Sequence, residues 1–124
     1  MWAPVARPEI IRDRLATYPD FAGYETRGFF DYMGTRVCRE YIDEIGSLEP
    51  LTWAQSYDKP IFFAQAEGDT VVKPDQVKAY LEIRKNRGDR LLLVDGGDHF
   101  FGAATNLDQL IVTSTDWLVT ILKP

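Results

Sequence analysis

The chain has 124 residues, of which 45% are hydrophobic, 13% aromatic and 27% charged. These proportions are typical of a soluble globular protein and exclude disordered and fibrous chains, and the length suits one domain. Fourteen basic and nineteen acidic residues give a net charge of −5, so the surface would repel nucleic acid and anionic membranes. We therefore expect neither of these as a partner.

Cys38 is the only cysteine, which excludes an intrachain disulfide and a zinc finger or ribbon. The first residues lack the basic start and the long apolar stretch of a signal peptide. These features favour a cytoplasmic protein. We expect no cofactor and no metal site, because a single histidine without a ligand motif does not provide a set of metal ligands.

The first third of the chain predicts an edge strand and one helix. The apolar segment at residues 2–6 predicts a strand, which Pro4 restricts to an edge or a strand end. Apolar residues at helical spacing predict a helix over residues 8–17. The aromatic residues and glycines of residues 19–34 follow no period, and we interpret this segment as a loop or short hairpin over a pocket.

Thr35 offers an N-cap for a second helix, which would run to about Ile45 with Cys38 as a small core residue on its apolar stripe. A further helical turn is predicted at residues 51–56.

The second half of the chain predicts the order strand, helix, strand, helix. The two strands, near residues 60–66 and 90–95, are almost continuous apolar runs, as in parallel strands that are covered on both faces. The helices are predicted from Pro74 to about Arg87 and from an N-cap at Asn106 to the C-terminus. This order implies right-handed crossovers and a parallel sheet with helices on its faces.

Candidate catalytic side chains follow these two strands. Asp69 comes after the first strand and His99 after the second, and loops at the carboxyl ends of adjacent parallel strands meet at one edge of the sheet. Each residue also has a structural interpretation. Asp69 could cap the helix from Pro74, and His99 taken alone could be a structural or surface residue.

The flanking sequences resemble the C-terminal portion of an α/β-hydrolase. Residues 65–72, Gln-Ala-Glu-Gly-Asp-Thr-Val-Val, resemble the strand end that carries the acid of the catalytic triad, and residues 96–100, Gly-Gly-Asp-His-Phe, resemble the turn that carries the base. The resemblance implies that Asp69 is the acid and His99 the base. It is closest to small bacterial enzymes of the feruloyl-esterase and acylglycerol-lipase kind.

The resemblance extends over the whole chain and implies its organisation. Residues 1–6 resemble the strand that follows the nucleophile elbow, residues 7–58 resemble a helical lid insertion, and residues 59–124 resemble the last part of the fold. The expected fold class is α/β, a truncated α/β-hydrolase in a single domain with about three parallel strands and flanking helices. Because lids in this family line the substrate site, the candidate substrate residues are Phe29, Phe30, Tyr32 and Phe100.

The sequence contains no nucleophile elbow of the form Gly-x-Ser-x-Gly. Its serines are Ser47, Ser56 and Ser114, and none has this context. In one interpretation the chain is part of a carboxylic ester hydrolase that supplies the acid, the base and the lid, with little or no activity alone. In the other it is a catalytically inactive remnant that binds at most small apolar or aromatic ligands. A doubly wound binding module explains the order of elements but not the paired Asp and His loops.

A sheet with only these strands would expose an apolar edge. We therefore expect a homodimer through the exposed strand edge and the lid helices, with or without exchange of a segment between protomers.

Overall fold

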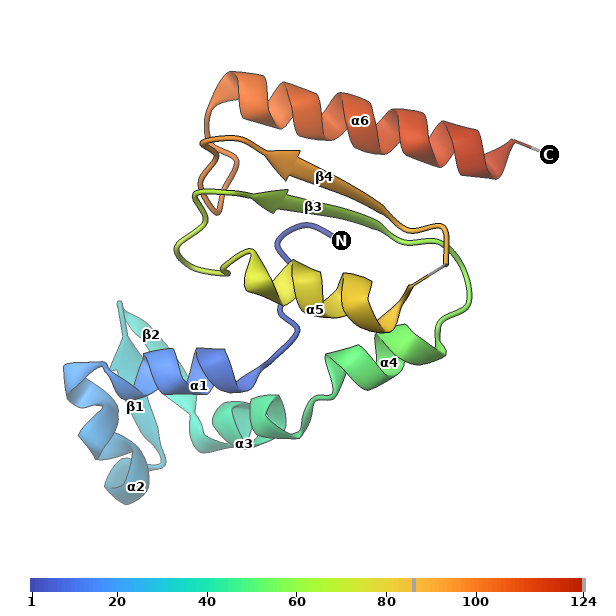
Figure 1. Cartoon of the computed structure of the whole chain (residues 1–124). Helices are drawn as coiled ribbons and strands as arrows, with labels where there is room; N and C mark the ends of the chain where they lie inside the picture. Colours follow the sequence, from blue (N-terminus) through green and yellow to red (C-terminus); the bar gives the residue numbers. More distant parts are fainter. Residues whose placement is uncertain (86, 124) are drawn as a thin grey trace. The chain divides into compact units, whose positions relative to one another are not determined.

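The computed structural model describes residues 1–85 and 87–123, which form two compact units (Figure 1). The sheet unit consists of Met1–Ala6 and the chain from Leu51 onward, and the hairpin unit consists of Arg7–Pro50. The single-domain organisation with boundaries after residues 6 and 58 stays a prediction.

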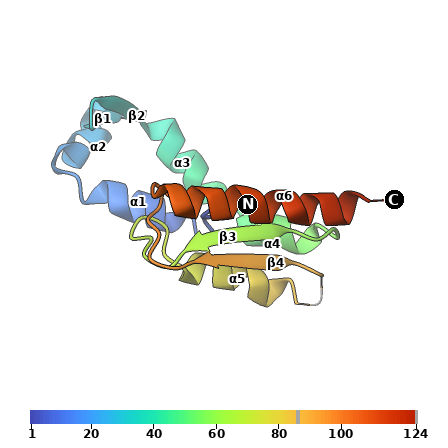
Figure 2. The same ribbon diagram turned by 90° about the horizontal axis from the view of Figure 1, so that it is seen from above.

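The sheet unit has a parallel pair of strands between helices. Its elements are α4 (Pro50–Ser56, whose first residue belongs to the other unit), β3 (Phe62–Ala66), α5 (Asp75–Ile83), β4 (Arg90–Val94) and α6 (Ala104–Leu122). The register pairs Phe62 with Arg90 and Ala66 with Val94. Helices α5 and α6 lie on opposite faces of this pair (Figures 1 and 2).

Every residue of β3 is buried, and its side chains alternate between two apolar clusters. Phe63 packs with Val77 and Tyr80 on the α5 face. Phe62 packs with Leu110 on the α6 face, and its ring lies 5.6 Å from that of Trp117. The prediction of a strand covered on both faces is confirmed for β3. It holds only in part for β4, in which Leu91 packs on the α5 face and Leu92 on the α6 face, but only Val94 is buried.

Three parallel strands were expected, and the described residues contain two, because residues 2–6 form no regular strand. This segment contributes one isolated parallel bridge, between Trp2 and Ala64. Ala3 then has a left-handed backbone with φ of 41°. Beyond it, the carbonyl of Val5 accepts from the Tyr80 hydroxyl at 2.7 Å. The backbone therefore leaves the sheet after one bridge and bonds to side chains of α5.

A buried guanidinium joins α4, α5 and the start of β4. Arg84 donates to both carboxylate oxygens of Asp89, at 2.7 and 2.9 Å, and to three backbone carbonyls, those of Ala54, Tyr57 and Lys59. The bonds to Asp89, followed by the attraction of its charge, raise the pKa of Arg84 against the effect of burial. Asp89 also accepts from the backbone N–H of Ile61 just before β3, so one ion pair organises this end of the sheet unit.

The hairpin unit packs short helices against a two-stranded antiparallel sheet. Its elements are α1 (Glu9–Ala16), the 3₁₀ helix η1 (Pro19–Gly23), α2 (Tyr24–Arg27), β1 (Phe29–Tyr32), β2 (Thr35–Cys38) and α3 (Arg39–Ser47). Five buried side chains form its core, those of Leu15, Tyr24, Phe30, Val37 and Ile42. The helical lid insertion expected over residues 7–58 stays a prediction as a lid; in this unit helices are combined with the β1–β2 hairpin, which overlaps the loop or short hairpin expected over residues 19–34.

The prediction of Thr35 as an N-cap is wrong, and so is the predicted helix over residues 36–38. Thr35 pairs with Tyr32 across a turn in which Met33 and Gly34 have φ of 51° and 81°, so the chain continues as β2 and the helix begins at Arg39. Cys38 is the last residue of β2 and is exposed, which corrects its assignment to a helix core.

The other predicted helices are present with shifted ends. The helix over 8–17 corresponds to α1, the turn at 51–56 to α4, and the helix from Pro74 to α5, which ends at Ile83. The last predicted helix is α6, whose N-cap is Ala103 and not Asn106. Residues 86 and 124, at which two of these predictions fall, lie outside the described residues. Among the residues described, no helix has the length and apolar character needed to cross a membrane.

We expect Arg84→Met to lower the free energy of unfolding by about 3–5 kcal/mol, because it leaves the buried carboxylate of Asp89 without a counter-charge. Urea denaturation followed by circular dichroism measures this change. Lys85→Met, at an exposed neighbour, should stay within about 0.5 kcal/mol of wild type. Equal effects of the two substitutions would contradict the role assigned to the buried pair.

Candidate active site

The turns that follow β3 and β4 approach each other closely because two glycines face one another. A Cβ added to Gly68 would lie 2.8 Å from the carbonyl oxygen of Gly97. A Cβ added to Gly97 would lie 3.1 Å from the Cβ of Ala66, at the end of β3. Side chains at these two positions would push the turns apart, so the glycines permit the loops of Asp69 and His99 to meet.

Asp69 is held by hydrogen bonds to both of its carboxylate oxygens, and its side chain has no exposed surface. Oδ1 accepts from the backbone N–H groups of Val71 and Val72, both at 2.8 Å. Oδ2 lies 2.9 Å from Nδ1 of His99 and accepts from Nε2 of Gln65 at 3.3 Å. The structure thus brings together the two residues that the sequence singled out, while their catalytic role stays a prediction.

The charge state of Asp69 determines the tautomer of His99. Burial raises the pKa of Asp69, but the hydrogen bond from His99 and those from the Val72 and Val71 amides outweigh it, so that the pKa lies below its usual value. An ionised carboxylate can only accept hydrogen bonds, so Nδ1 of His99 carries the proton. Neutral His99 therefore presents an unprotonated Nε2, and none of the described residues forms a hydrogen bond with that atom.

The turn that carries His99 is fixed by hydrogen bonds from its backbone N–H groups to the side chain of Asp98. Oδ1 of Asp98 accepts from the N–H groups of Phe100 and Gly102, each at 3.0 Å. Phe101 is buried with φ of 53°, a left-handed conformation that is uncommon for a bulky residue. His99 is left 27% exposed and accessible to a reacting group.

Gln65 is a residue of this site that the sequence analysis did not single out. It is fully buried as the next-to-last residue of β3, and its Nε2 donates to both Asp69 and the carbonyl of Val72, the latter at 2.9 Å. The signal that could have identified it is a single polar residue in the otherwise apolar run of residues 61–66.

The serines make only local bonds among the described residues. Ser47, Ser56 and Ser114 each donate to the carbonyl three residues earlier in their own helices. None of them is bonded to His99.

The four candidate substrate residues lie in different surroundings. Phe100 is 81% exposed beside His99, with the two rings edge-to-face at 5.2 Å. In the hairpin unit, Phe30 is fully buried in the core, Tyr32 packs against Tyr18, and the guanidinium of Arg36 lies 4.2 Å from the ring centre of Phe29. Phe100 is therefore the candidate substrate residue of the sheet unit that contacts His99.

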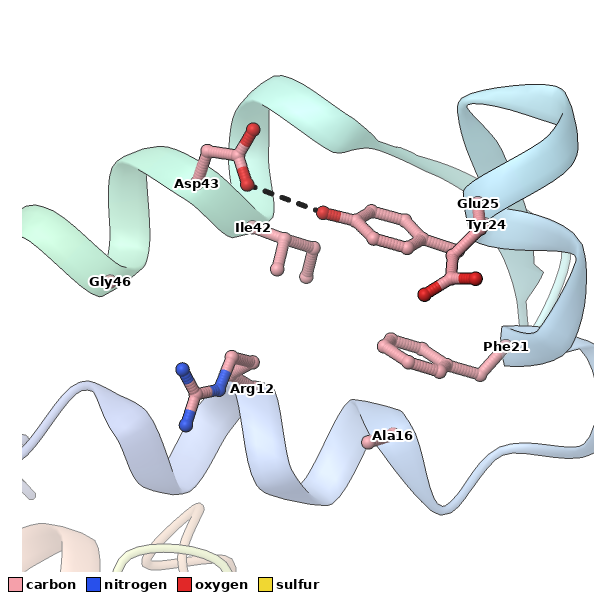
Figure 3. A pocket seen from close by; sticks show the side chains of 8 residues that line it. All are labelled: Arg12, Ala16, Phe21, Tyr24, Glu25, Ile42, Asp43 and Gly46. Carbon is pink, nitrogen blue, oxygen red and sulfur yellow. Dashed lines mark hydrogen bonds between the residues drawn. The ribbon is translucent and has the colours of Figure 1, made fainter.

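The hairpin unit also contains a cavity of about 460 Å³ (Figure 3). It is lined by Arg12, Ala16, Phe21, Tyr24, Glu25, Ile42, Asp43 and Gly46. The ring of Tyr24 stacks on that of Phe21, with the ring centres 5.3 Å apart, and the guanidinium of Arg39 lies 5.6 Å from the centre of the Tyr24 ring. The Tyr24 hydroxyl donates to Asp43. The cavity contains none of the predicted substrate residues.

Comparison with known proteins identifies the fold. No protein-family model and no curated protein matches the sequence. Among solved structures, the chain is similar to Est1E from Butyrivibrio proteoclasticus with ferulic acid bound, with a TM-score of 0.72 at 19% identity over 98% of this chain. Est1E is an esterase of the α/β-hydrolase family. The chain has part of an α/β-hydrolase-like fold.

A second structure of Est1E matches with a TM-score of 0.63 at 18% identity over 77% of this chain. The two matches cover 49% and 39% of the Est1E chains, so this chain spans about half the length of the hydrolase that it resembles.

We expect Asp69→Asn to reduce the loss of stability that the protein undergoes as the pH is lowered. The pKa of Asp69 is lower in the folded chain than in the unfolded chain, where it is about 3.9. The ionised carboxylate therefore stabilises the fold at any pH above the unfolded pKa, and this stabilisation is lost as the pH falls through the folded pKa. Denaturation midpoints between about pH 6 and pH 2 should therefore fall less steeply for the variant than for wild type. Asp108→Asn, at an exposed position of α6, is the matched control and should keep the wild-type slope. A wild-type slope in Asp69→Asn would show that this carboxylate carries no such stabilisation.

Proposed function

We propose that the chain supplies the acid and the base of a serine carboxylic ester hydrolase, and that the nucleophile lies on a segment or chain beyond these 124 residues. The observation that carries the proposal is the Asp69–His99 pair, at 2.9 Å, with Nε2 of His99 unbonded to the described residues. The similarity to about half of an esterase chain supports a partial hydrolase. The loop motifs around Asp69 and His99 support the proposal that this part is the C-terminal one.

The geometry fits one half of a triad reaction. Nε2 of His99 would accept the proton of a serine hydroxyl as its oxygen attacks the ester carbonyl, and the resulting imidazolium would be stabilised by ionised Asp69. The same nitrogen would then donate that proton to the departing alcohol, leaving an acyl-serine. Water, losing a proton to Nε2, would then attack the acyl carbonyl, and Nε2 would donate that proton to the departing serine oxygen, which releases the carboxylic acid and restores both the serine and neutral His99.

An uncovered face of α6 supports a missing partner segment. A stripe of four residues at helical spacing is 43–73% exposed: Leu107, Ile111, Leu118 and Leu122. Apolar helix faces of this kind are normally packed against another element. We propose that the nucleophile-bearing part covers this α6 stripe.

The chain alone should not hydrolyse a short p-nitrophenyl ester and should form no adduct with a fluorophosphonate probe. Co-expression with the polypeptide encoded upstream of Met1 should restore both, with the adduct on a serine of that polypeptide. His99→Ala in the restored enzyme should lower kcat by about 10⁴-fold or more. Restored activity that survives His99→Ala would contradict the assignment of the base.

The exposed α6 stripe also favours a second candidate, in which the chain alone is an inactive dimeric remnant that takes up small apolar or aromatic ligands. The exposed strand edge and the helices of the hairpin unit would add to its contact surface, and a two-fold interface lets one apolar patch cover its own copy.

Light scattering at low micromolar concentration should therefore give the mass of a dimer for the isolated chain. Ile111→Asp with Leu118→Asp should shift the mass to that of a monomer, because a charge on the stripe opposes its burial. Gln109→Asp and Thr120→Asp together, at exposed positions of α6 on the side of the helix opposite the stripe, provide the control and should leave the dimer intact. A wild-type monomer would exclude the dimeric form.

A further inference from the structure

Gln65 is the one polar residue of the otherwise apolar strand β3. The other four residues of β3 are Phe and Ala, and all five are buried. Gln65 has no exposed surface, and its Oε1 has no hydrogen-bond partner among the described residues. An apolar side chain would leave no such unpaired atom. We therefore look for the reason for a glutamine in the hydrogen bonds that its Nε2 group donates.

The orientation of the amide is set by its neighbours. Nε2 lies 2.9 Å from the carbonyl oxygen of Val72, 3.2 Å from that of Ala66 and 3.3 Å from Oδ2 of Asp69. All three are acceptors, so rotating the amide by half a turn would place Oε1 against three oxygens. The donor therefore faces the Asp69 turn, and the unpaired oxygen is the consequence.

Two protons are shared among these three acceptors. The bond to Val72 is the shortest, and the second proton is divided between Ala66 and Asp69. Gln65 thereby connects the rigid strand to both ends of the turn over residues 69–72.

From these contacts we infer that Gln65 is a positioning residue, which holds the carboxylate of Asp69 in line with Nδ1 of His99. Oδ1 of Asp69 is bonded only to amides of its own turn, Val71 and Val72, and these bonds would move with the turn. Gln65 is the described side chain that links this turn to β3 on the oxygen that also meets His99. The inference rests on the proposed function for its catalytic meaning, but the positioning itself can be measured in the chain alone.

The sole histidine makes the test direct, because nitrogen-15 NMR of the labelled chain gives one pair of imidazole nitrogens. Neutral His99 should be mainly protonated at Nδ1 in the wild type. Gln65→Met should lower the ratio of the Nδ1–H to the Nε2–H tautomer by about fivefold, the size expected for the loss of one hydrogen bond.

Gln76 provides the matched control. It is a second buried glutamine of the sheet unit, on α5, and its Oε1 accepts from the backbone N–H of Ala6 at 3.0 Å. Gln76→Met should lower the melting temperature and leave the His99 tautomer ratio as in the wild type. An unchanged or raised ratio in Gln65→Met would reduce Gln65 to a structural residue and overturn the inference.

A measurement on the wild type covers the case in which Gln65→Met does not fold. The side-chain amide signals of Gln65 should shift as the pH is taken through the protonation of His99, and those of Gln76 should not. Absence of that shift for Gln65 would also overturn the inference. Failure of the upstream polypeptide to restore esterase activity would instead count against the proposed function and leave these NMR results as they are.

Discussion

The parallel pairing of β3 with β4 is the constraint on which the candidate site depends. Its register places Ala66 beside Val94, so the chain leaves both strands at the same edge of the sheet. Asp69 and His99 follow within a few residues of these strand ends, and the glycines at 68 and 97 let the two turns touch. The apolar packing on both faces of β3 keeps this strand in place, and the polar contacts then need only short turns to reach each other.

The two ends of the sheet unit differ in how completely their polar groups are hydrogen-bonded. At the start of the strands, the buried guanidinium of Arg84 is fully paired with Asp89 and three carbonyls, which gives a closed structural network. At the opposite end, Asp69 is also fully bonded, but one nitrogen of His99 and one oxygen of Gln65 are not bonded to the described residues. Unsatisfied groups therefore gather at the end where chemistry is proposed.

The sequence predicted the elements that depend on local pattern. The apolar run before Ala66, the helical spacing of α1 and α6 and the two loop motifs around Asp69 and His99 each have a recognisable signal. Features that depend on tertiary contacts were missed. The turn at Met33 and Gly34 falls within the expected loop or short hairpin, but Val37 and Cys38 also fit the apolar stripe of the following helix, so the sequence predicted helix for β2. Residues 2–6 have the sequence pattern of a strand, but after one bridge to β3 their backbone forms a hydrogen bond with Tyr80 of α5.

The distribution of rare side chains gives the two units separate optical reporters. All three tryptophans, at positions 2, 53 and 117, belong to the sheet unit, whereas the exposed thiol of Cys38 belongs to the hairpin unit. A dye on that thiol and the intrinsic fluorescence therefore follow different parts of the same polypeptide. Comparing their melting curves distinguishes a chain that unfolds as one cooperative block from one in which the hairpin unit opens first while the sheet stays folded.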